Sequence, residues 1–367
     1  MKKWILIIAC LCGWLLIPSH VMAQMSVQDY FDYQEVDQIL EEIFPEEKLK
    51  FSELVARITE GESVWQTLFD FFEQQFTYEF YGAKKSLVQI LLIVLVAAVF
   101  HNFSEVFQNQ QVAEIGFYAL YMIFITICIG TFHTLLGAVE EGVTKLLNFF
   151  RALGPVYFMG VAITTGSATS IAFYNILLFI IHLAEALVKN ILLPLVQTFF
   201  VFRILNEMSK EEYLSKFGEL IQMLIKWILR VFLAGVAGIS MIQGMLSPAI
   251  DSVKRSELTR GGEALPIVGD AIGGVTEVML GTAVLIRNGI GIAGAVICIA
   301  ICLVPIVQMA GIVVMYRFAA AIVQPISEKR MINCIGNMAD GASLLLQIIL
   351  TSCALFLIVI AIVSNTT

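Results

Sequence analysis

Long apolar stretches are the feature that most constrains how this chain can fold, and they recur from residue 86 to the C-terminus. A helix needs about 20 predominantly apolar residues to cross a bilayer. Apolar residues make up 59% of the chain and charged residues 14%, against roughly 45–50% and 25% in soluble domains. A soluble core could not bury so much apolar surface, so we predict an all-α, polytopic α-helical membrane protein. The clear spanning candidates are approximately Ser86–Phe107, Gly116–Gly137, Ile171–Val188, Ile191–Ile204, Trp227–Leu246, Gly289–Tyr316 and Ala342–Val363.

Two further stretches, Gly154–Ser170 and Leu265–Ile286, are less hydrophobic and rich in Gly and Thr. Each begins beside a proline. Re-entrant or broken helices have this composition, and so do short spans that pack against other helices. We therefore expect seven or eight transmembrane helices in all, counted from these stretches.

The first 23 residues have the pattern of a secretory signal peptide. Lys2 and Lys3 form the charged start, an apolar core follows, and small residues precede a cleavage point after Ala23. An uncleaved anchor helix is the alternative. In either case residues 24–85 are expected to form an exported helical region, which carries fourteen Asp and Glu against five Lys and Arg. Residues 86–367 would then form the polytopic membrane domain.

Four prolines within apolar stretches are candidate helix breaks, because proline removes a helix hydrogen bond and in lipid leaves a carbonyl without its donor. They form two pairs, each with a spacing of 39 residues, and the second members lie in LPLVQ (193–197) and VPIVQ (304–308). We interpret this as a degenerate internal repeat of residues 116–205 and 227–316, with chance similarity as the alternative. In transporters built from repeats, such breaks meet at the bilayer midplane. The four are Pro155, Pro194, Pro266 and Pro305.

Small and polar residues spaced by four form a stripe within residues 265–291. On a helix they would share one face, where small residues allow close packing and an acid needs a partner or water. The stripe is either a tight helix–helix seam or part of a polar pathway. The packing candidates are Gly269, Gly273 and Gly281, and the pathway candidates are Asp270, Glu277, Arg287 and Arg317. Arg317 either pairs with an acid of another segment or extends to the membrane interface.

No pattern predicts catalysis, a cofactor or a metal site. Gly289, Gly291 and Gly294 spell G-x-G-x-x-G, but that pattern binds dinucleotides only after a strand, so here it predicts a packing surface. Cys298 and Cys302 are one helical turn apart without His or carboxylate neighbours. Small buried apolar groups are their expected role, rather than metal ligands. We predict that the protein is not an enzyme.

The orientation of the chain stays open. Residues 203–230 are basic and predict a cytoplasmic location, and from Glu207 they have the pattern of an amphipathic helix lying along that face. Lys84 and Lys85 precede the first span on the side expected to be exported, which conflicts with this.

The densest motifs lie in LPIVGDAIGGVTEVMLGTAVLIRN (265–288) and GIGIAGAVICIAICLVPIVQMAGIVVMYRFAAAIVQPIS (289–327). These segments resemble the stage III sporulation protein AE family, SpoIIIAE, and the similarity extends over nearly the whole chain. The N-terminal 60 residues are the least diagnostic.

The resemblance implies a multi-pass protein of the cell membrane that is made in the mother cell and placed in the outer forespore membrane. Its implied partners are the other proteins of the same sporulation operon and the forespore protein SpoIIQ, in a secretion-like channel complex. The complex supports forespore development after engulfment. An ATPase at residues 207–230 is a further expectation, and nothing implies nucleic-acid binding.

Three functions remain in competition. The first is a membrane subunit of that complex without catalysis of its own. The second is a stand-alone secondary transporter, which would need buried acids on a path open to solvent; only Glu185, Asp270, Glu277 and Asp340 qualify. The third is a passive membrane scaffold.

Overall fold

The computed structural model describes residues 31–44, 50–60, 88, 110–164, 167–208, 214–262, 269–325 and 327–365. Within these ranges the side chains of 110–114, 117, 167–169, 173, 240–262, 269–283 and 362–365 are not described. The predicted signal peptide, most of the first predicted span and Pro266 lie outside the described residues.

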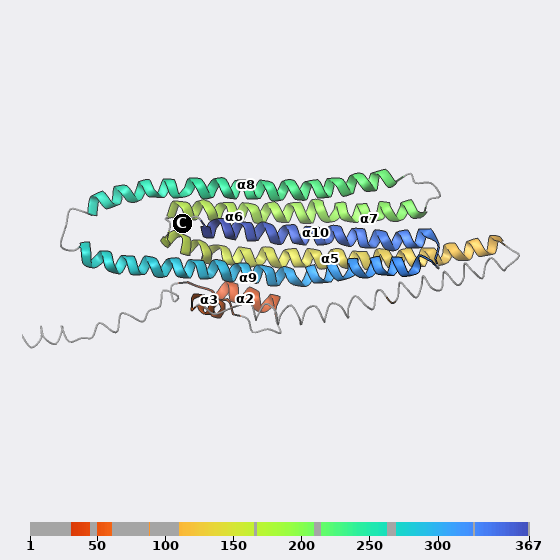
Figure 1. Cartoon of the computed structure of the whole chain (residues 1–367), viewed down its shortest axis with the longest axis horizontal. Coiled ribbons are helices and arrows are strands. Elements are labelled where there is room, and N and C mark those ends of the chain that lie inside the picture. Colours follow the sequence, from red (N-terminus) through yellow and green to blue (C-terminus); the bar gives the residue numbers. More distant parts are fainter. Residues whose placement is uncertain are drawn as a thin grey trace, which may run out of the picture.

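Long helices running side by side form an elongated bundle, with two short helices against one flank (Figure 1). The short helices are α2 (Gln34–Ile43) and α3 (Phe51–Thr59). The bundle comprises α5 (Gln110–Thr164), α6 (Ser167–Leu187), the π-helical turn η3 (Val188–Leu192), α7 (Leu193–Met208), α8 (Ser215–Gly262), α9 (Gly269–Val323) and α10 (Lys329–Asn365). The predicted all-α, polytopic class is confirmed.

The described residues contain five helical stretches long and apolar enough to cross a membrane, so the predicted number of seven or eight is not confirmed. Stretches predicted as separate spans join into single helices, as in α9, which takes in both Gly289–Tyr316 and most of Leu265–Ile286. At 55 residues each, α5 and α9 are about 80 Å long. A hydrocarbon core is about 30 Å thick, so both helices exceed one crossing.

None of the three candidate prolines that the structure describes ends its helix. Pro155 lies inside α5 and Pro305 inside α9. Pro194 is the second residue of α7, which directly follows η3. A π-turn is wider than an α-turn, and widening the turn there eases the clash between a proline ring and the carbonyl four residues earlier.

The C-terminal parts of the two predicted repeats, residues 153–205 and 264–316, follow different backbone paths. Residues 153–205 contain the end of α5, a reversal into α6, and α7, whereas the described part of 264–316 lies entirely in α9. Pro194 is exposed, whereas the matching Pro305 is buried. The matching motifs LPLVQ and VPIVQ therefore lie in different surroundings.

Close packing at glycines holds the bundle together. In lipid there is no hydrophobic drive between helices, so van der Waals fit must bring them together. A Cβ added at Gly294 would lie 2.7 Å from Leu153 Cδ2, and one at Gly289 would lie 2.8 Å from Thr59 Cγ2. Gly291 lies against the ring of Tyr157 at 3.4 Å. These contacts confirm that the G-x-G-x-x-G sequence is a packing surface, towards α3 and α5.

The pair of α2 and α3 packs on α9 and α5 through an apolar face (Figure 1). Asp37 of α2 accepts a hydrogen bond from the backbone N–H of Phe51 at 2.6 Å, and so caps the first turn of α3. The Phe51 ring in turn meets Phe149 of α5, with centroids 6.5 Å apart. The other acidic side chains of α2, which are Glu35, Glu41 and Glu42, are exposed.

The segment 207–230 is not one helix. Glu207 lies in α7, and α8 begins at Ser215. Asn206 closes the connection, because its Oδ1 accepts a hydrogen bond from the N–H of Leu214 at 3.0 Å. From Ser215 the chain runs along the bundle as part of α8, in contact with α6, α7 and α10.

Tyr33 makes the docking of the α2–α3 pair on the bundle less stable at high pH. Its ring packs beside Phe51, its hydroxyl is buried without a hydrogen-bond partner among the described residues, and burial raises the pKa of Tyr33 to about 12. The undocked phenol would ionise near pH 10, so docking binds a proton that the free chain has lost. Docking stability is therefore complete below pH 10 and falls as the pH rises from 10 to 12.

Replacing Tyr33 with phenylalanine is expected to leave stability at neutral pH unchanged or slightly higher, because no hydrogen bond is lost. The variant should also lack the extra loss of stability between pH 10 and 12. Thermal unfolding of both proteins across that range measures the difference. Parallel pH profiles for wild type and variant would contradict the assignment.

Candidate functional site

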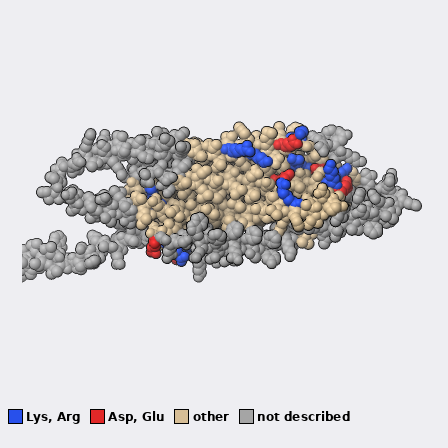
Figure 2. Space-filling view, viewed as in Figure 1, with Lys and Arg blue, Asp and Glu red and all other residues tan. Residues whose placement is uncertain are grey.

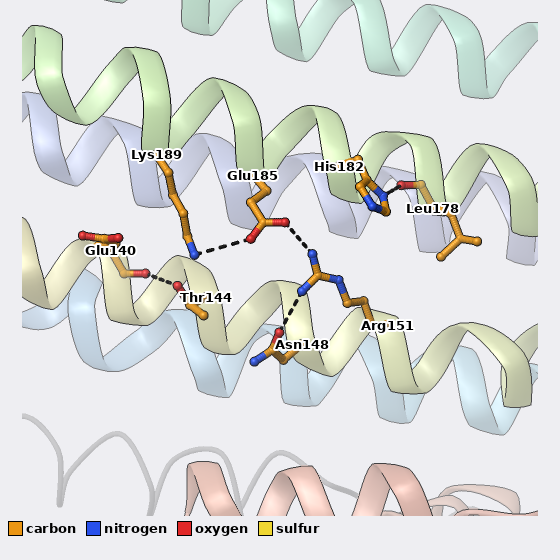
Figure 3. Close-up of polar contacts among 8 residues, drawn as sticks. All are labelled: Glu140, Thr144, Asn148, Arg151, Leu178, His182, Glu185 and Lys189. Carbon is orange, nitrogen blue, oxygen red and sulfur yellow. Dashed lines mark hydrogen bonds and ion pairs between the residues drawn. The ribbon is translucent and has the colours of Figure 1, made fainter.

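A charged seam joins α5 to α6 and η3. Arg151 of α5 donates from Nη2 to Glu185 Oε2 at 2.5 Å and from Nη1 to Asn148 Oδ1 at 3.1 Å. Lys189 of η3 approaches Glu185 Oε1 at 3.5 Å. Figure 3 shows the three charged side chains converging between the helices, whereas His182 bonds to the Leu178 carbonyl of its own helix.

Both oxygens of Glu185 are thus engaged by cations from two elements. The Glu185 side chain is 33% exposed, so the pair is only partly shielded from its surroundings. A carboxylate held between two cations is a fixed counter-charge and clamps the α5–α6 hairpin just before the π-turn. Sequence reasoning named Glu185 but neither cation. Arg151 is 34 residues away, whereas the i,i+4 spacing of Lys189 was a signal that could have indicated it.

A cavity of about 350 Å³ lies beside Pro305, between α5, α9 and the end of α2. Pro305 packs against Gly142, where an added Cβ would lie 3.1 Å from its ring. Pro305 has no N–H to offer to the carbonyl of Ile301, and Ile301 lines the same cavity. The other lining residues are Ile43, Phe44, Ala138, Glu141, Lys145, Val304 and Gln308.

The polar groups that line this cavity come from α5 and from the VPIVQ motif of α9. Lys145 and Glu141 form an ion pair at 2.7 Å on α5, and Gln308 adds an amide from α9. Pro155 lies 13 residues beyond Gly142 on α5, about 20 Å along the helix. The structure therefore does not bring Pro155 and Pro305 together.

Arg287 is buried, with 1% of its surface exposed. It donates from Nη1 to Thr164 Oγ1 and from Nη2 to Asn288 Oδ1, each at 3.2 Å. Gly160 leaves room for it, since an added Cβ would lie 3.4 Å from the Arg287 side chain. Arg287 thereby joins α9 to the C-terminal end of α5.

Arg317 lies elsewhere on the same helix. It pairs with Asp340 of α10 at 3.1 Å, and both side chains are substantially exposed. Thirty residues separate Arg287 from Arg317, which is about 45 Å along a continuous helix, so the two do not form one site. Gly269, Gly273, Gly281, Asp270 and Glu277 lie in the N-terminal part of α9, where side chains are not described; their role stays a prediction.

Three buried cysteines converge between α9 and α10. The Sγ atoms of Cys298, Cys302 and Cys353 all lie within 4.8 Å of one another. The sequence indicated the first two as a pair on one helical turn. Nothing in it indicated Cys353, which is brought to them only by the packing of α10 on α9.

The family profile described as stage III sporulation protein AE matches residues 49–367. The chain belongs to this family. The match includes every described helix from α3 onwards, so the charged seam and the cysteine cluster lie within it, as does the Pro305 cavity apart from Ile43 and Phe44.

Stage III sporulation protein AE of Bacillus subtilis (strain 168) is 24% identical over 252 residues. The aligned region covers 68% of this chain and 63% of that protein, so the chain spans less than two thirds of its relative. No solved structure matches.

Proposed function

We propose that this member of the stage III sporulation protein AE family is the polytopic membrane subunit of a secretion-like channel complex between mother cell and forespore. It would lie in the outer forespore membrane and support forespore development after engulfment, without catalysis of its own. The observation that carries the proposal is the family match over residues 49–367, together with a bundle of long apolar helices.

Charge distribution supports one orientation of the bundle. Figure 2 shows charged side chains of this face gathered towards the end where α7 and α8 meet. The start of α10, with Lys329 and Arg330, lies at the same end, since Asn333 of α10 donates to Glu207 of α7 at 2.9 Å. Basic residues concentrate on cytoplasmic connections. This end would therefore face the mother-cell cytoplasm.

The outward face of α8 at this end is a candidate docking surface for a cytoplasmic ATPase. It combines the basic Lys216 with exposed apolar side chains in the first turns of α8, such as Phe217 and Met223, which are 60% and 71% exposed. A photo-crosslinking amino acid at Met223 is expected to capture a cytoplasmic protein during sporulation. The buried Ile225 is the matched control position. Crosslinks from Met223 to exported proteins alone would contradict this orientation.

Residues 24–85 would lie between the two membranes. The exposed acidic side chains of α2 would be available there to the proteins of the same operon and to SpoIIQ, while its apolar face stays on the bundle. To test this, the full-length chain is purified from sporulating cells in mild detergent. We expect those proteins to accompany it. A chain that purifies alone and moves a solute in liposomes would instead be a transporter.

Substitution of Glu185 separates the channel subunit from an ion-coupled transporter. In a structural clamp, Glu185→Gln keeps an acceptor for Arg151 and should leave heat-resistant spore counts within about threefold of wild type, for a cost near 1 kcal/mol. Glu185→Leu removes the acceptor as well as the charge and should lower chain abundance and spore counts at least tenfold, because Arg151 and Lys189 then have no acceptor at this position. Glu219→Gln, in an exposed pair with Lys216 on α8, is the control.

A transporter that carries a proton on Glu185 predicts a different pattern. Glu185→Gln would then abolish function as completely as Glu185→Leu, although the chain would still accumulate in the membrane. That result would contradict a structural role for Glu185 and would favour the transporter. A scaffold, in contrast, should tolerate bulky replacements of Gly269, Gly273 and Gly281 once the complex has assembled.

A further inference from the structure

The cluster formed by Cys298, Cys302 and Cys353 has the donor set of a metal site. The three side chains are buried, with 0%, 3% and 8% of their surface exposed, and their Sγ atoms lie within 4.8 Å of one another. Three ligands bound at about 2.3 Å in a trigonal plane would have sulfur–sulfur distances of about 4 Å. The thiols therefore need only small side-chain movements to surround one ion.

Helix geometry explains why the thiols point to one place. Residues at i and i+4 share a helix face, so Cys298 and Cys302 both face α10, where Cys353 lies opposite them. Other buried cysteines are elsewhere: the Cys334 Sγ lies 3.4 Å from the Tyr121 hydroxyl, and Cys128 is not in the cluster. The convergence is a property of this one contact between α9 and α10.

We propose that this cluster binds a single soft monovalent ion, with Cu(I) as its natural class of ligand. Thiolate sulfur selects Cu(I), zinc and iron–sulfur clusters. Among the described residues the group contains three cysteines and no histidine or carboxylate as a fourth ligand. Structural zinc is almost always four-coordinate, whereas three sulfurs suffice for Cu(I).

Charge balance in the apolar interior also favours a monovalent ion. Binding of Cu(I) releases one thiol proton to solvent and leaves one thiolate, two thiols and one cation, so the net charge of the site stays at zero. A net charge in this apolar packing would carry a large desolvation cost. The copper enters and remains as Cu(I), so no electron is transferred.

The test uses the full-length chain, reduced and anaerobic in detergent, carrying Cys10→Ser and Cys12→Ser so that the N-terminal thiols do not bind copper. Cu(I) is supplied in competition with a chromogenic Cu(I) chelator. We expect one copper per chain, and an increase in apparent Tm when it binds. X-ray absorption should show three sulfur neighbours.

The matched variants locate the site. Cys298→Ser and Cys353→Ala should each weaken Cu(I) binding at least tenfold and abolish the Tm increase, whereas Cys128→Ala should change neither. The Tm of each variant without copper shows whether it is folded. Absence of copper on the reduced parent protein, or equal binding by folded Cys298→Ser, Cys353→Ala and Cys128→Ala proteins, would overturn the proposal.

Discussion

Replacing Gly341 with leucine is expected to disrupt the bundle, whereas leucine at Gly336 of the same helix should be tolerated. A Cβ at Gly341 would lie 2.5 Å from Phe132 Cε2 and 2.9 Å from Cζ, while nothing lies within 4 Å of one at Gly336. The Phe132 ring cannot retreat easily, because it is stacked on Phe200 with centroids 3.9 Å apart. Overpacking of this kind costs about 1–3 kcal/mol or more.

The measurements are chain abundance in the membrane and the apparent Tm in detergent. Gly341 of α10, Phe132 of α5 and Phe200 of α7 meet at one junction, so the clash should separate three helices. Adding Phe132→Ala makes room for the new side chain and should recover part of the lost Tm. If Gly341→Leu and Gly336→Leu proteins have equal Tm, the close contact between α10 and α5 is not present.

Alanine at Gly289 is expected to release α3 from α9 while the bundle remains folded. Its Cβ would lie 2.8 Å from Thr59 Cγ2, and α3 is a short helix that can move as a unit. We expect a loss of about 1–3 kcal/mol in docking. Faster proteolysis of residues 31–60, with no change in the remaining fragment, measures this release.

Two matched variants isolate the contact. Gly311→Ala gives α9 the same gain of about 1 kcal/mol in helix propensity, but its Cβ has no neighbour within 4 Å. Thr59→Ser deletes only Cγ2 and keeps the hydroxyl, which donates to the carbonyl oxygens of Val55 and Ala56. Thr59→Ser should therefore restore docking in the Gly289→Ala protein. Unchanged proteolysis in Gly289→Ala alone would show that α3 does not rest on α9.

Several features follow from residue order over short distances. Apolar stretches of membrane-spanning length predicted the fold class, because the ability of a helix to cross a bilayer depends on the hydrophobicity of its own residues. The glycines of G-x-G-x-x-G predicted a packing surface without knowledge of its partner. The motifs of residues 265–327 were sufficient to indicate the family. None of these inferences requires knowing which helix lies beside which.

The number of long helices was decided by tertiary structure. The span predicted from the sequence ended at Gly137, before a charged stretch, yet α5 continues through that stretch. Glu141 and Lys145 form an i,i+4 pair there, which stabilises a helix rather than ends it. Hydropathy records where apolar segments stop, but a helix stops only where the backbone loses its hydrogen bonds.

Pairings between residues far apart in the chain could not be predicted from the sequence either. Glu185 could be recognised as an acid in an apolar helix, but its partner Arg151 is supplied by the α5–α6 reversal. Cys298 and Cys302 could be read as neighbours, but Cys353 joins them only because α10 packs antiparallel on α9. The order of residues along the chain determined the composition of each helix. Helix packing decided which side chains meet, because contacts across a bundle depend on the relative placement of whole helices.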